Sequence, residues 1–154
     1  MLDEAEAILR QDDALDITID DGRLCGQSNS PFWQICVEAQ AANSPVTRMN
    51  WILPVSGDGR VFLADTIAAF GEPFAAKLCG RVDTWHSVVI FNDNVVVVAY
   101  GGSVIMNEPR RFAPDQRVEQ VLYYVEGMIP PLYTQDGLPW RGYGEPAEQS
   151  VCQI

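Results

Sequence analysis

Two side chains in this chain are of the types that nucleophilic enzymes use. His86 is the only histidine, and Cys79 lies seven residues before it. An imidazole within hydrogen-bond reach activates a thiol as a nucleophile, so one hypothesis is a small hydrolase that uses Cys79 and His86. The interpretation that we favour is a partly exposed histidine on a strand. We therefore expect a protein that is not an enzyme and has no catalytic residues.

The same residue types argue against a metal centre. One histidine and four scattered cysteines do not have the ligand spacing of a zinc site. The acidic residues between Asp12 and Gly22 suggest calcium. However, a calcium loop that begins at Asp16 would have Asp21 at its sixth position, where the sharp turn needs glycine. We expect a solvated acidic loop there, with no metal and no cofactor.

Aromatic residues are numerous, and exposed tyrosine and tryptophan are typical anchors of protein interfaces. Neighbouring residues of a strand point to opposite faces, so one of Tyr123 and Tyr124 should point outward. We expect binding of a protein partner through the face of a sheet. The candidate binding residues are Trp85, Tyr100, Tyr123, Tyr124 and Trp140.

Two of the four cysteines, Cys25 and Cys36, bracket the turn-rich residues 26–31. If these cysteines face each other across a hairpin, a disulfide between them is geometrically allowed. Free buried thiols that act as small apolar side chains are the alternative. The cysteine count leaves both readings open.

The formal net charge is −11 and the isoelectric point is near 4.3, which argue against nucleic acid and against anionic membrane surfaces as partners. No run of about 18 apolar residues is present, so we expect no direct membrane insertion. Met1 and Leu2 lead into an acidic helix without the polar residue that usually precedes one. We therefore expect that a natural lead-in, with a signal or an anchor, has been lost. The sequence does not indicate an oligomeric state.

Apolar periodicity predicts the elements that position these residues. Residues 95–100 form a continuously apolar run, which must be covered on both faces, by a helix on one side and by the 130–145 tail or a second molecule on the other. The other expected elements are helices at 2–11, 61–70 and 74–79, and strands at 17–20, 24–25, 33–39, 49–55, 85–91 and 118–125.

The sequence contains an internal repeat of one small unit. Residues 2–9 are similar to residues 63–70, and residues 46–52 are similar to residues 118–124. A repeat fixes architecture more firmly than local propensity does. We therefore expect an α+β fold of two tandem units, each a helix plus an antiparallel meander, with the helices on one face of a mostly antiparallel sheet. The expected units are 2–55 and 56–126, followed by an irregular tail at 127–154, in one compact domain.

Residues 61–73 combine a turn, a short helix, Gly-x-Pro and a following meander with aromatic residues. This segment resembles the fold shared by the β-lactamase inhibitor protein and the small lipoprotein subunit of the outer-membrane β-barrel assembly machinery. The inhibitor has two such units in tandem. The tail residues 139–144 are similar to the end of small bacterial lipoproteins of unknown role.

The resemblance implies a fold, and function does not follow from fold alone. The lipidated cysteine of such lipoproteins is absent near the start of this chain. Our leading hypothesis is a non-enzymatic protein-binding module, the soluble part of a small lipoprotein of unknown role, located outside the cytoplasm or in the cell envelope. The alternatives are a Cys/His hydrolase, a structural or assembly subunit, and a cytoplasmic location.

Overall fold

The computed structural model describes residues 1–29, 32–41, 44–54, 56–80, 84–92, 94–103, 111–144 and 149–150. Its first half contains helix α1 (Leu2–Leu9) and strands β1 (Asp16–Asp20), β2 (Arg23–Asn29), β3 (Phe32–Ala39) and β4 (Val46–Ile52). Its second half begins with α2 (Leu63–Phe70), β5 (Ala75–Gly80), β6 (Thr84–Phe91), β7 (Val95–Ser103) and β8 (Val118–Tyr124). The second half ends with α3 (Pro131–Thr134), β9 (Leu138–Pro139) and β10 (Gln149–Ser150).

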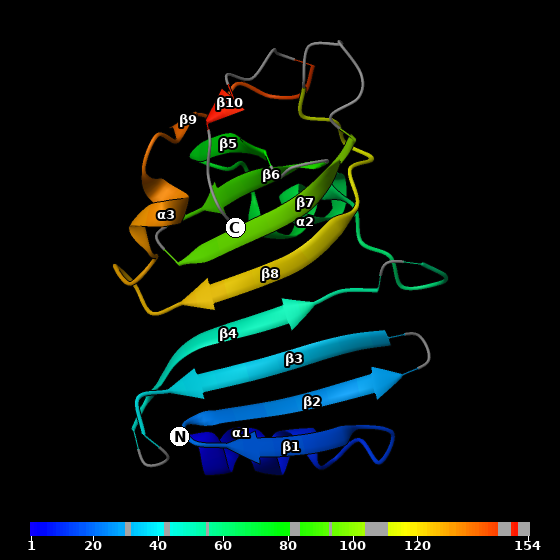
Figure 1. The fold of residues 1–154 in the computed structure, drawn as a ribbon, viewed down its shortest axis with the longest axis vertical. Helices are drawn as coiled ribbons and strands as arrows, with labels where there is room; N and C mark the ends of the chain where they lie inside the picture. The colour runs from blue at the N-terminus through cyan, green and yellow to red at the C-terminus, as the bar shows by residue number, and fades with distance from the viewer. Residues whose placement is uncertain are drawn as a thin grey trace.

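One continuous sheet runs along the molecule (Figure 1). Its strand order is β1-β2-β3-β4-β8-β7-β6-β5-β10, and β9 pairs with β5. The neighbours are antiparallel except for β10 and β5, which are parallel. The first half forms the lower part of the sheet in Figure 1 and the second half forms the upper part, and they meet where β4 pairs with β8.

The expected α+β fold of two helix-plus-meander units is wrong. Backbone pairing continues from β4 to β8, so the strands form one β-rich sheet. The helices in the described residues have only eight, eight and four residues. Residues 74–79, expected as a helix, belong largely to β5, in which Leu78 packs with one core cluster and Cys79 with another. The tail expected to be irregular contains α3, β9 and β10.

Both eight-residue helices lie on the same face of the sheet. Directly paired residues share a face, and one row of pairs connects Leu24 with Val37, Met49 and Tyr123. Leu24, Val37 and Met49 belong to the cluster under α1, whereas Tyr123 packs against Phe70 of α2. We name this side the helix face and the other side the opposite face. In Figure 1 both helices lie behind the sheet.

Local chemistry explains where α2 begins and ends. The Asp65 carboxylate accepts a hydrogen bond from the backbone N–H of Phe62 at 2.8 Å, which satisfies a donor that the first turn leaves free. Gly71 follows the last helical residue with φ +85°, a backbone conformation that favours glycine. Leu63, Ile67 and Phe70 then pack on the core of the second half.

The valine run of β7 is covered on both faces, so this prediction from the sequence is confirmed. All residues of Val95–Ala99 are buried. On the helix face the run packs in a cluster with Ile67 and Phe70, and on the opposite face it packs with Tyr133 and Ile129 of the tail. Covering both faces is what a continuously apolar strand requires.

The first half has a much smaller core, whose fully buried members are Leu2, Leu24 and Val37. Gly26 lies under α1, where a Cβ atom would be in ordinary van der Waals contact with Leu9 Cδ1, at 3.4 Å. Every residue of β4 is at least partly exposed, although β4 lies in the middle of the strand order. The two halves therefore share one sheet but differ in burial.

Candidate functional site

The structure does not bring the five residues proposed from the sequence together. Trp85 and Tyr123 lie in or against the helix-face cluster of the second half, and only 8% of Trp85 is exposed. Tyr124 lies on the opposite face, where it is buried beside Tyr133. Burial is the main cause that raises the pKa of Tyr124 to about 12. These side chains therefore serve mainly as packing.

The other two proposed residues lie in separate places. Tyr100 is beside His86, at 5.9 Å between ring centroids, and the Arg117 guanidinium lies 5.2 Å from the Tyr100 ring. Trp140 packs against the Phe112 ring at 5.1 Å, within the tail that covers the second half. Trp140 also packs against the helix-face cluster that contains Trp85 and that Tyr123 contacts, so these three side chains pack around one core, whereas Tyr100 and Tyr124 lie elsewhere.

Cys79 and His86 are directly paired across β5 and β6, as a nucleophile and its base would need to be. Cys79 is disulfide-bonded, however, so it has no thiol to activate. His86 Nε2 lies 3.1 Å from Glu119 Oε2, and an Arg117 nitrogen lies 2.8 Å from Glu119 Oε1. The hydrogen bond from His86, followed by that from Arg117, lowers the pKa of Glu119. The arrangement is a polar cluster that joins β6 to β8.

Cys25 and Cys36 form a disulfide across β2 and β3, with their Cα atoms 4.1 Å apart. The hairpin considered in the sequence analysis brings them together, because the register places the two residues directly opposite each other. The bridge lies on the opposite face, since neighbouring Leu24 and Val37 point to the helix face. A covalent link therefore supports the half of the sheet with the smaller core.

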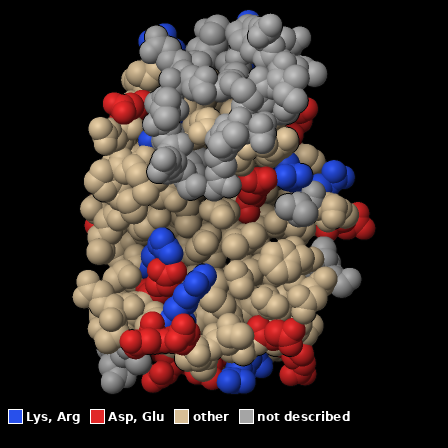
Figure 2. All heavy atoms as spheres, in the orientation of Figure 1, with Lys and Arg blue, Asp and Glu red and all other residues tan. Residues whose placement is uncertain are grey.

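The opposite face of the first half has a row of ion-paired side chains beside this disulfide. A carboxylate oxygen of Glu38 lies 2.6 Å from an Arg48 nitrogen and 3.6 Å from an Arg23 nitrogen. Figure 2 views this face, and basic and acidic side chains gather over its lower half. The charges are largely satisfied by one another, so this row does not by itself indicate a ligand.

An apolar strip remains exposed on the helix face of the first half. Trp51 of β4 pairs with Ile35 of β3, and Trp33 follows on the same side of β3. We name Trp33, Ile35 and Trp51 the Trp51 strip. Trp51 is 39% exposed, and the other two are partly buried. The strip runs from β3, which α1 contacts, to β4, and it borders the cluster under α2 where Trp51 pairs with Val121.

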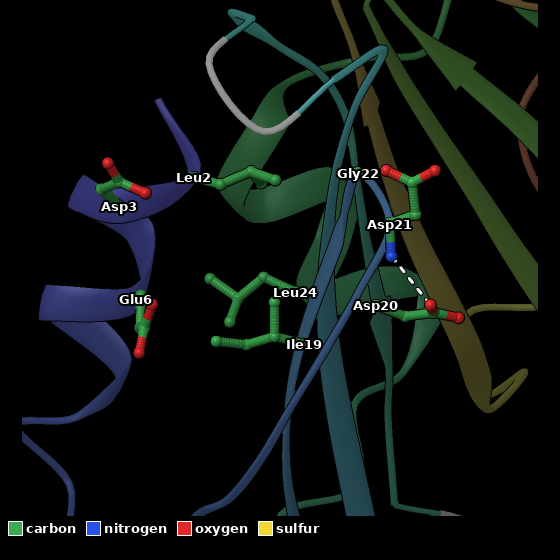
Figure 3. Close-up of a pocket in the computed structure, with 8 residues that line it drawn as sticks. All are labelled: Leu2, Asp3, Glu6, Ile19, Asp20, Asp21, Gly22 and Leu24. Atoms are coloured by element: carbon green, nitrogen blue, oxygen red, sulfur yellow. Dashed lines mark hydrogen bonds between the residues drawn. The ribbon is translucent and has the colours of Figure 1, made fainter.

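A groove lies on the other side of α1, between this helix and the β1–β2 hairpin (Figure 3). Its volume is about 380 Å³. Ile19 and Leu24 point from the strands toward the helix, which carries Asp3 and Glu6, whereas the carboxylates of Asp20 and Asp21 lie on the other side of the strands. The lining residues are Leu2, Asp3, Glu6, Ile19, Asp20, Asp21, Gly22 and Leu24.

Among the described residues, no group of three or more histidine, cysteine or acidic side chains is placed to hold a metal ion. The acidic segment suggested for calcium is divided among the segment before β1, β1 itself and the turn after it. In the same residues, no helix is long and apolar enough to cross a membrane. Besides the Trp51 strip and the groove, a second hollow of about 370 Å³ is lined by Phe74, Glu126, Gly127, Ile129 and Thr134.

No protein family, curated protein or solved structure matches the chain. The resemblance to the β-lactamase inhibitor fold therefore stays a prediction, and the site must be argued from its own geometry.

Sequence reasoning missed the Trp51 strip, although a signal for it was present. Residues 33–39 alternate between apolar and polar, and Trp51 lies between polar Asn50 and the end of its strand. Both patterns predict half-exposed strands. What the pattern could not show is that β3 and β4 are neighbours whose aromatic side chains share one face.

Proposed function

We propose that this chain is a non-enzymatic extracytoplasmic protein-binding module that binds its partner through the Trp51 strip. The observation that carries the proposal is the exposure of Trp51, 39%, on an inner strand of the sheet. Tryptophan is enriched among the residues that dominate the binding energy of interfaces. A partner would remove from water an apolar surface that the fold itself leaves open.

The setting of Trp51 supports a role as an anchor. It is flanked across the strands by Ile35 on one side and by Val121, which is buried, on the other. The indole therefore stands on a paired backbone and loses little freedom on binding, which reduces the entropy cost of association.

The proposed location rests on the disulfides. Cys25 is bonded to Cys36, and Cys79 is disulfide-bonded as well. Disulfides persist in oxidising compartments and are rare in the cytosol, which supports an extracytoplasmic or envelope location over a cytoplasmic one. The same bonding at Cys79 speaks against the hydrolase alternative. We keep the soluble part of a small bacterial lipoprotein as the proposed context.

The test is site-specific photo-cross-linking in a native envelope extract. A photoreactive phenylalanine analogue replaces Trp51 in one variant and Val125 in a matched control, because Val125 is also a large exposed apolar residue, 46% exposed, outside the strip. We expect a discrete adduct from position 51 that excess unlabelled protein suppresses and excess Trp51→Ala protein does not. Equal adducts from both positions, or suppression by both competitors, would contradict the proposal.

A further inference from the structure

Strand β1 forms one edge of the sheet. In the described part of the chain its only strand neighbour is β2, with which it pairs from Asp16 to Asp20. Hydrogen-bonded and non-hydrogen-bonded pairs alternate in an antiparallel ladder, so about half of the β1 amide and carbonyl groups point away from β2. Such an edge is a template for an additional strand.

The two sides of this edge differ in chemistry. Ile17 and Ile19 lie on the helix face, and Ile19 is 58% exposed where it lines the groove beside α1. Asp16, Thr18 and Asp20 alternate with them on the opposite face and are exposed. An added strand would therefore meet isoleucine on one side and carboxylates on the other.

The rim of the groove is acidic as well. Asp3 of α1 lines it, and Asp20 and Asp21 line its strand side with their carboxylates directed to the other side of the strands. Glu6 also lines it, but its carboxylate is paired with Arg10 at 2.7 Å. The floor is apolar, since Leu2 and Leu24 are buried. An occupant that satisfies this site carries positive charge and an apolar side chain in alternation.

We propose that the β1 edge binds an extended basic segment of a partner protein by strand addition. Valine-like side chains of the segment lie over Ile19 in the groove, and the alternating lysine or arginine side chains lie beside Asp16 and Asp20. Main-chain hydrogen bonds give such complexes affinity, and alternate side chains give specificity. The inference rests on the proposed function only in one respect, that the chain binds proteins. It places the partner segment on a different surface from the Trp51 strip.

A second copy of this chain is the less suitable occupant. Antiparallel pairing of β1 with another β1 would bring Asp16 of one copy close to Asp20 of the other. Like charges that face each other across strands are destabilising. The net charge of −11 adds repulsion between copies and attraction toward a basic partner.

The experiment measures fluorescence anisotropy of a short, end-blocked peptide of alternating lysine and valine, titrated with the full chain at low salt. The test variant is Asp16→Asn/Asp20→Asn, and the control is Asp58→Asn/Asp115→Asn, which removes the same charge at two exposed positions elsewhere. We expect the test variant to weaken binding about tenfold and the control less than about twofold, because only nearby charges contribute strongly. A second peptide with N-methylated alternate amides keeps the charge but cannot pair along one edge, and we expect it not to bind.

Equal weakening by both double variants, or undiminished binding of the N-methylated peptide, would overturn the inference. Dimerisation of the test variant in sedimentation, absent from the control, would show that the edge pairs with a second copy. Trp51→Ala separates the two proposals, because it should leave peptide binding unchanged. If cross-linking from position 51 fails while the peptide binds as expected, the Trp51 proposal alone is wrong.

Discussion

Strands β4 and β7 are both inner strands of one sheet, yet they have opposite surroundings. In β7 the run Val95–Ala99 is buried on both faces, under α2 on one side and under the tail with Tyr133 on the other. In β4 no residue is buried, and Trp51 is exposed. The difference indicates that stability resides mainly in the second half of the sheet, while the first half has the smaller core.

The sequences of the two strands explain this difference. β7 is continuously apolar at its start, and water must be excluded from both of its sides. β4 alternates Met49 and Trp51 with Arg48 and Asn50, so only one of its faces is apolar. Of the tail after β8, Tyr133 packs on the opposite face of the second half and Trp140 packs against its helix-face cluster. The first half is stabilised by one short helix, α1, and by the Cys25–Cys36 disulfide.

The largest expected difference in the free energy of unfolding is between two single tryptophan-to-alanine variants, one in each half of the sheet. Trp85→Ala should lower the free energy of unfolding by about 3–5 kcal/mol, because it leaves a cavity in the core of the second half. Trp51→Ala should lower it by less, about 1–2 kcal/mol, since 39% of that residue is already in water. Urea unfolding of the two variants checks this, with Trp85→Phe as the control that restores most of the loss. Similar losses at the two positions would remove the distinction between the halves.

Removing the disulfide should have the next largest effect. Cys25→Ala/Cys36→Ala should cost about 3 kcal/mol, as expected for a short closed loop whose unfolded chain becomes less restricted. The bridge spans 11 residues and joins two strands of the weaker core. Hydrogen exchange should show that the amides of β1 to β3 lose protection, while the protection of amides in β6 and β7 changes little. Uniform loss of protection across both halves would mean that they unfold as one unit.

Substitution of a buried lysine in the second half should cause a smaller loss of stability. Lys77 is buried and donates hydrogen bonds from Nζ to the carbonyl oxygens of Leu132 and Gln135, at the end of α3. Lys77→Met keeps the apolar stem and should cost about 1–2 kcal/mol, because these carbonyls lose their donor. The measurement is thermal unfolding, with the exposed Arg141→Met as the control. No loss at Lys77 would show that α3 does not need this anchor.

The smallest expected effect is a change in acid stability. The pKa of Glu119 is lowered from 4.5 in the folded chain, so the carboxylate stabilises the fold above that pH, and this contribution is lost as pH falls through the folded pKa. Glu119→Gln should therefore be less stable than the parent at pH 6 and closer to it at pH 3. Urea unfolding at both values measures the difference. A constant difference between the two pH values would contradict the ion cluster with His86 and Arg117.

Much of the strand content could be predicted from residue patterns. The valine run and the alternation at 33–39 each correspond to a strand of the structure. The fold class could not be predicted, because the pairing of β4 with β8 joins residues far apart in the sequence and leaves no local pattern. The segment 74–79 was misjudged for a related reason. Ala75 and Ala76 suit a helix by propensity, but pairing with β6 and β9 makes this segment a strand.

The candidate site was harder to predict than the fold. Trp85 and Trp51 are the same residue type on strands, and no local feature tells which one the chain covers. Trp85 is buried because Gly101 has no side chain, since a Cβ atom there would lie 2.1 Å from the Trp85 ring. Among the described residues, Trp51 belongs neither to the cluster under α1, which includes Met49 of the same strand, nor to the cluster under α2. Both outcomes depend on distant residues.

The measurement that tests the two-half account most directly is native-state hydrogen exchange, resolved by residue, on the unmodified chain. We predict that the amides of Val96–Val98 in β7 exchange only through global unfolding, whereas those of Met49–Trp51 in β4 exchange through smaller openings with a lower free energy. Equal, globally limited exchange in β4 and β7 would contradict the account, because the first half would then be as stable as the second.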